Sequence, residues 1–158
     1  MNNGYKIVLS GGKTAVSDFR HLSWISFLGC IPSNYPLLPF NRRLMESIFF
    51  PTNSDNNGRL LLAPYSLRKV EAALLEYGSK EEEVIVADPR KLNTVIGPDT
   101  KVVGLTIHDP LGYAVSQLIA SLFMLIDWWP APSYTAADFN EIISNPLLKK
   151  FGSKLIKA

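Results

Sequence analysis

The residues best suited to chemistry lie in one short segment, made of His108, Asp109, Pro110, Leu111 and Gly112. A histidine can ligate a metal or transfer a proton, and an adjacent carboxylate can set its tautomer. The segment directly follows a predicted strand, which is where open α/β sheets bind ligands. The alternative interpretation is structural: His108 ends the strand, Asp109 caps the next helix, and Pro110 lies in its first turn. Both interpretations stay open at this point.

A second segment, made of Ser10, Gly11, Gly12, Lys13 and Thr14, follows the first apolar run and ends like a phosphate-binding loop. That motif needs another glycine five residues before Gly12, where this chain has an isoleucine inside the predicted strand. A loop this short cannot wrap a phosphate, which favours an ordinary glycine turn. Its glycines would still let a flat or phosphorylated ligand approach the backbone closely.

The composition excludes several classes of function. The 158 residues include 16 Lys+Arg and 14 Asp+Glu, and this balance gives no broad basic field for nucleic acid. The single cysteine, Cys30, cannot form an internal disulfide or hold a zinc ion or iron–sulfur cluster alone. No signal peptide is visible, and Gln117 and Asp127 interrupt the longest apolar stretch. We therefore expect a cytoplasmic protein with no membrane partner.

Apolar runs predict parallel strands near residues 5–10, 84–88, 102–107 and 154–158. The first three are aliphatic and β-branched without polar alternation, which is typical of strands covered on both faces. Right-handed crossovers then give an α/β fold, a Rossmann-like or flavodoxin-like three-layer sandwich with strand order 2-1-3-4. Because the chain stops inside the fourth run, we expect it to be part of a longer protein.

Three helices are predicted between and after these strands. The first covers residues 67–77, with Ser66 as its cap and Gly78 at its end. Its predicted buried face consists of Leu67, Val70, Ala73, Leu74 and Tyr77. A core helix follows at residues 112–129. The third starts at Thr135, where Asp138 completes the spacing of a capping box.

Residues 15–63 do not fit this alternation and are interpreted as an insertion within a single domain that covers residues 1–158. A helix is predicted at residues 41–50, and the polar stretch at residues 51–58 is expected to be an exposed loop.

Several segments resemble the amino-terminal, cobalamin-binding-type domain found ahead of radical S-adenosylmethionine modules. The clearest is residues 63–74, from the end of the insertion into the first helix. Residues 84–89, 96–100 and 102–104 continue the pattern in the same order, and residues 109–112 complete it.

The resemblance implies a Rossmann-like cofactor- or substrate-binding domain of an oxidoreductase or methyltransferase. A catalytic radical S-adenosylmethionine module would then follow residue 158 as this domain's partner. That module would carry the [4Fe–4S] cluster and S-adenosylmethionine, because the family's cysteine triplet is absent here. Cobalamin would be the candidate ligand of this domain, over Ser10–Gly12 and His108–Gly112. The family's Asp-x-His-x-x-Gly motif is not matched, since Thr106 stands at the aspartate position and Gly112 falls one residue late.

Two functions are therefore open. The first is the cofactor domain of a radical S-adenosylmethionine enzyme, and the second is a non-enzymatic Rossmann-like interaction domain without a ligand. A nucleotide-binding domain is disfavoured because no Gly-x-Gly-x-x-Gly follows any predicted strand.

Overall fold

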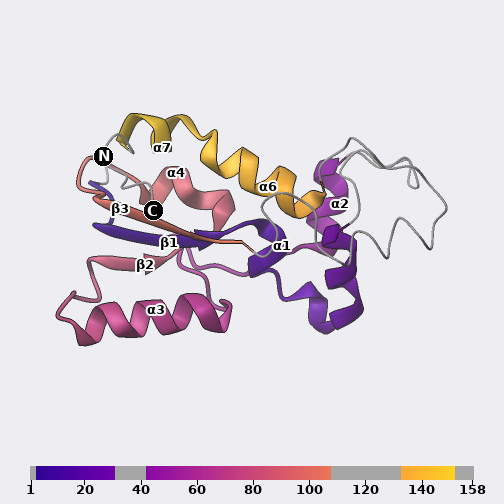
Figure 1. The fold of residues 1–158 in the computed structure, drawn as a ribbon, viewed down its shortest axis with the longest axis horizontal. Coiled ribbons are helices and arrows are strands. Elements are labelled where there is room, and N and C mark those ends of the chain that lie inside the picture. The colour runs from indigo at the N-terminus through magenta and orange to yellow at the C-terminus, as the bar shows by residue number, and fades with distance from the viewer. Residues whose placement is uncertain (1–2, 31–41, 108–132, 152–158) are drawn as a thin grey trace.

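A parallel sheet organises the chain. The computed structural model describes residues 3–30, 42–107 and 133–151. Within them the strands are β1 (Ile7–Gly11), β2 (Val84–Val86) and β3 (Val102–Thr106), in the order β2-β1-β3 (Figure 1). Both neighbours of β1 run parallel to it. This confirms the α/β class and the first three predicted strands, while the predicted strand at residues 154–158 lies outside the described residues.

The helices predicted at residues 41–50, at residues 67–77 and from Thr135 are present with shifted ends, together with short helices that the sequence did not predict. In chain order they are α1 (Lys13–Val16), the 3-10 helices η1 (Phe19–His21) and η2 (Ser23–Cys30), α2 (Arg42–Phe49), α3 (Tyr65–Glu76), the 3-10 helix η3 (Pro89–Lys91), α4 (Leu92–Val95), α6 (Tyr134–Ile143) and α7 (Pro146–Phe151). The helix predicted at residues 41–50 is confirmed as α2. The helix predicted at residues 112–129 lies outside the described residues.

Helices cover both faces of the sheet. Successive residues of a strand point to opposite sides, so an apolar strand has two faces to bury. Val8 and Ile85 pack on one side against α4, α6 and α7, and Leu9 and Val86 pack on the other side against α3 (Figure 1). The strands β1 and β2 are buried as predicted, whereas Val102 of β3 is 49% exposed. Within the described residues β3 is an edge strand, so its predicted burial is only partly confirmed.

The predicted buried face of α3 is only partly confirmed: it is right for Leu67 and Leu74 and wrong for Val70, Ala73 and Tyr77. Leu67 and Glu71 are buried and Leu74 is partly buried, whereas Val70 is 47% and Tyr77 is 91% exposed. A glutamate can occupy the inner face because two guanidinium groups pair with it. The side chains of Arg59 and Arg68 each donate to one of its carboxylate oxygens at 2.7 Å.

The helix caps also differ from the sequence prediction. Ser66 lies inside α3, which begins one residue after Pro64, although Gly78 ends the helix as predicted with a φ of +98°. The helix α6 is capped by Ser133, whose hydroxyl accepts from the backbone N–H of Ala136 at 3.2 Å. Thr135 and Asp138 therefore form no capping box, and Asp138 is used elsewhere.

Part of the insertion is tied to the sheet, so the prediction of an exposed loop at residues 51–58 holds only in part. Asp88, directly after β2, is 2% exposed and accepts from Thr52 Oγ1 at 2.8 Å and Ser54 Oγ at 2.9 Å. Asn56 at the tip of the loop is exposed, but Gly58 near its end is buried. A buried carboxylate needs such donors, and here they fix the loop against the sheet.

Candidate functional site

The carboxyl ends of β1 and β3 lie side by side. Gly11, the last residue of β1, pairs with Thr106, the last residue of β3. The two predicted ligand loops therefore leave the sheet at adjacent positions, although residues 108–112 themselves lie outside the described residues. The chain passes from β1 to β2 on one side and then returns across β1 to β3 on the other side. The gap between the ends of β1 and β3 is therefore the switch point at which open α/β sheets bind ligands.

The predicted contact residues at the end of β1 and just after it are packed against other parts of the chain. Ser10, Gly11 and Gly12 are all buried, and Ser10 Oγ donates to the carbonyl of Ala87 at 2.9 Å. A Cβ atom on Gly11 would lie 2.8 Å from a methyl carbon of Thr106. The absence of a side chain at Gly11 therefore allows the close packing of β3.

A polar network holds α6 over this corner. The backbone N–H of Thr14 donates to Asp138 Oδ2 at 3.1 Å, and Thr14 Oγ1 bonds Thr135 Oγ1 at 3.2 Å. A Cβ atom on Gly12 would lie 3.2 Å from the Cβ of Asp138. Asp138 is 1% exposed. The missing side chain at Gly12 thus makes room for α6, and α6 covers the backbone of Gly12.

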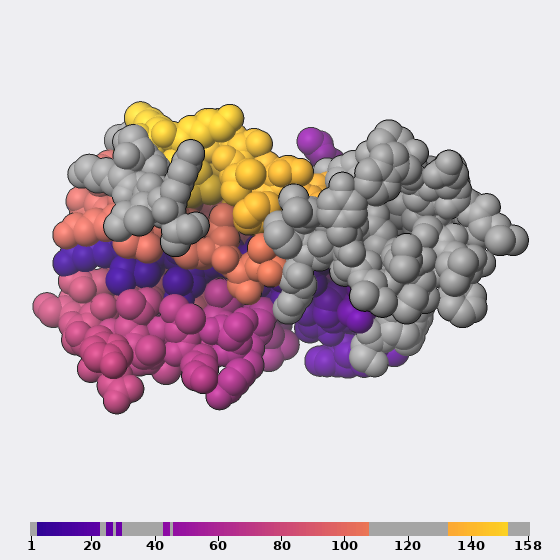
Figure 2. All heavy atoms as spheres, viewed as in Figure 1, coloured from indigo at the N-terminus to yellow at the C-terminus, as the bar shows by residue number. Residues whose placement is uncertain are grey.

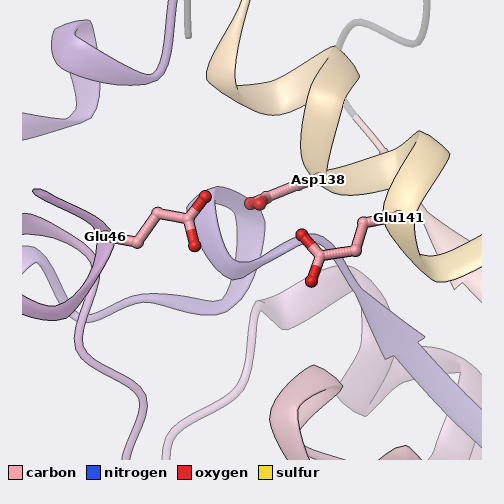
Figure 3. A group of neighbouring side chains, drawn as sticks. All are labelled: Glu46, Asp138 and Glu141. Carbon is pink, nitrogen blue, oxygen red and sulfur yellow. The ribbon is translucent and has the colours of Figure 1, made fainter. Parts of the chain in front are cut away.

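Lys13 lies at the centre of a cluster of three carboxylates. Its Nζ is 2.8 Å from Glu46 Oε2, 3.3 Å from Glu141 Oε2 and 3.8 Å from Asp138 Oδ1. Figure 3 shows the three acidic side chains converging on one space from α2 and α6. One ammonium group therefore links the segment after β1, the insertion and the C-terminal helices.

The environment of Lys13 stabilises its charged form. Burial alone would lower the pKa of Lys13, but the hydrogen bond that Lys13 Nζ donates to Glu46 and the charges of Glu46, Asp138 and Glu141 outweigh burial and raise it. Lys13 is thus a charged structural group at neutral pH, with its ammonium engaged by carboxylates. Lys13 is the residue that made the glycine turn resemble a phosphate-binding loop, and here its ammonium binds carboxylates of the same chain.

The carboxylates could in principle hold a metal ion, since ligand atoms of Glu46, Asp138 and Glu141 lie within 4.8 Å of one another. Hard cations such as Mg²⁺ and Ca²⁺ prefer such oxygen ligands. The ammonium of Lys13 already lies among these oxygens and supplies the positive charge. The arrangement is therefore explained as a buried ion-pair network.

A cleft of about 1360 Å³ lies beside this network at the carboxyl edge of the sheet. Its walls come from α2, from the segment that follows β2, and from α6 and its end. Arg90 on one wall donates to the carbonyls of Glu46 and Phe50 and so holds the end of α2. Asn145 Nδ2, after α6, donates to Asn93 Oδ1 of α4 at 3.0 Å. The lining is mixed in charge and rich in amide groups.

Sequence reasoning did not single out Glu46, Arg90 or Glu141. One available signal was the i, i+3 spacing of Asp138 and Glu141, which places both on one side of a helix. Glu46 lies in the insertion, about 90 residues away along the chain, and no local pattern connects it to them.

Within the described residues, no helix combines the length and apolarity that a membrane crossing requires. No protein-family model, curated protein or solved structure matches the chain.

Proposed function

We propose that this chain is a cofactor-binding domain of the cobalamin-binding type, acting beside a radical S-adenosylmethionine module. The observation that carries the proposal is the pairing of Gly11 with Thr106, which sets two loop starts side by side at the switch point of a parallel sheet. The sequence resemblance suggests the ligand class, and the strand pairing supports a site at this edge of the sheet.

The finer fold belongs to the same proposal. The helices α6 and α7 lie on the same face as α4 (Figure 1). A right-handed crossover from β3 to a further parallel strand on its far side uses that face. We therefore propose that residues 154–158 extend the sheet beyond β3, giving the order 2-1-3-4 of a Rossmann-like domain.

The described residues fit cobalamin at one part of this edge and not at another. Ser10, Gly11 and Gly12 are buried, with Asp138 of α6 against Gly12 and Thr106 against Gly11, and they offer no surface to a corrin ring. The neighbouring cleft has the volume for a large organic ligand, and Asn93 and Asn140 on its walls match the amide groups around a corrin. We propose that residues 108–112 and this cleft hold the ligand, and that Ser10–Gly12 support the fold.

Within this proposal, cobalamin would supply its cobalt as a methyl or electron carrier. The residues of this chain would bind and orient its periphery. The amide groups of Asn93 and Asn140 can donate to and accept from corrin side-chain amides. His108 is the histidine nearest in sequence to the end of β3, and we propose that it would help to bind the cofactor.

The second function, an interaction domain without a ligand, is favoured by one specific observation. The corner after β1, which an open α/β sheet would offer to a ligand, is filled by α6 and Asp138. In this alternative the Rossmann-like sheet serves as a scaffold for contact with a neighbouring domain.

Titration with hydroxocobalamin, followed by its visible absorbance, separates the two. The 158-residue chain is expected to bind, and Ser47→Trp, which places a large ring in the cleft, is expected to weaken binding about tenfold or more. Asn56→Trp is the matched control, because Asn56 is exposed in the loop at residues 51–58. His108→Ala tests the second half of the site.

Absence of binding by the chain and by any longer form of the protein would favour the interaction domain. Binding that tolerates both Ser47→Trp and His108→Ala would place the ligand elsewhere and overturn the proposed site.

A further inference from the structure

The outer face of α3 carries an unusual concentration of exposed apolar side chains. Tyr65 is 81% and Tyr77 is 91% exposed, and Leu61 and Leu62, just before the helix, are both at least half exposed. The helix forms the lower layer of the molecule, and no other described element lies beneath it in Figure 1, nor over its lower edge in Figure 2. Tyr65 begins the helix and Tyr77 follows its last residue, so exposed apolar side chains occur along its whole length, and such surfaces mark contact sites for other proteins.

The exposed residues follow the spacing of a helix–helix seam. Ser66, Val70, Ala73 and Tyr77 are separated by four, three and four residues, and all four are exposed. This is the alternation by which one helix presents a continuous stripe to a second helix. The same stripe contains most of the face that the sequence predicts to be buried, and in this structure it points away from the sheet.

The stripe is complementary to a reversed copy of itself. In an antiparallel pair about a two-fold axis, Val70 of one copy lies opposite Ala73 of the other, and Tyr77 lies opposite Ser66. Each large side chain then meets a small one, which is the arrangement that packs without voids. In a parallel pair Tyr77 would instead meet Tyr77 and Val70 would meet Val70.

The charges at the side of the stripe agree with the antiparallel arrangement. Lys69 and Glu76 are exposed, are seven residues apart, and lie on the same flank of the stripe. A two-fold axis across antiparallel helices brings the same flanks together, so Lys69 of each copy lies beside Glu76 of the other. Two opposite-charge contacts then form, and they fix the orientation of the pair.

We propose that the chain forms a homodimer through antiparallel pairing of α3. A single twelve-residue helix and its flanking leucines make a small interface, so the dimer is expected to be weak and concentration-dependent. This inference does not depend on a cofactor or on the residues at the carboxyl edge of the sheet.

Sedimentation equilibrium on the 158-residue chain tests the proposal. The wild-type chain should dimerise within the range up to about 1 mM, as weak interfaces do. Lys69→Glu and Glu76→Lys should each raise the dissociation constant about tenfold, because each creates two like-charge contacts. Lys149→Glu, at an exposed position on α7, is the matched control and should leave the constant unchanged.

Mixing the two charge variants provides the sharper readout. In a heterodimer of Lys69→Glu and Glu76→Lys, both charge contacts are again between opposite signs, so an equimolar mixture should regain wild-type association. Circular dichroism confirms that each variant is folded. A wild-type chain that stays monomeric, single variants that dimerise like wild type, or a mixture that fails to recover would each overturn the proposal.

Discussion

Replacing Lys13 with methionine removes the shared cation of three carboxylates while keeping much of the side-chain volume. The side chain of Lys13 is only 15% exposed, and those of Glu46 and Asp138 are 5% and 0% exposed. Removing one partner of a buried ion pair costs about 3–5 kcal/mol of stability. We expect the lower end, about 3 kcal/mol, because the Glu141 side chain is 59% exposed and water stabilises its charge.

The loss should be visible in urea unfolding. With a slope of about 2 kcal/mol per M, a loss of about 3 kcal/mol moves the midpoint down by about 1.5 M. The matched control is Lys80→Met, since the Lys80–Glu82 pair has side chains 72% and 78% exposed and should contribute nothing measurable.

The pH dependence supplies a second signature. The pKa of Lys13 is raised in the folded chain, so its contribution is fully present below the pKa of an unfolded lysine and is lost as pH rises through the raised value. Lys13→Met lacks this titrating group, so the stability difference between wild type and variant should be full at neutral pH and should shrink as pH rises above the ordinary pKa of lysine. A midpoint shift no larger than that of Lys80→Met, or a difference from wild type that stays constant with pH, would refute this account of the network.

Two further outcomes are expected. His21 has a φ of +61° and is exposed, so His21→Gly should raise stability by about 0.5–1 kcal/mol in thermal unfolding by relieving left-handed strain; a lower melting temperature would contradict this. The purified 158-residue chain should show no iron–sulfur absorbance after reconstitution and no reductive cleavage of S-adenosylmethionine, because Cys30 is its single cysteine; detected cleavage would count against the assignment of that chemistry to a partner module.

The sheet could be predicted from the sequence because its signal is local. The runs that become β1 and β2 are aliphatic without polar alternation, and burial on both faces requires that composition. Right-handed crossovers, which are general to such folds, agree with the observed order β2-β1-β3 but do not determine it alone. The strands themselves needed no knowledge of distant contacts.

The orientation of α3 could not be predicted in the same way, because the helix carries two plausible stripes. The stripe with Val70 and Tyr77 is the more apolar, whereas the one with Leu67 and Leu74 includes the charged Glu71. Only the guanidinium of Arg59, twelve residues away, together with that of Arg68 makes burial of the glutamate favourable. Periodicity defines a stripe but does not say which stripe faces the sheet.

The same limit applies to the carboxyl edge, where the ion-pair network decides what a ligand can reach. Displacing α6 to expose Gly12 would separate Asp138 and Glu141 from Lys13. If that costs about 3 kcal/mol, as expected for Lys13→Met, a ligand that needs Gly12 exposed would bind roughly a hundredfold more weakly than its contacts alone provide. A ligand in the adjacent cleft carries no such cost, because the cleft is open while the network is intact. The stability of the Lys13 network is thus the physical reason for placing the proposed cofactor against the cleft and residues 108–112.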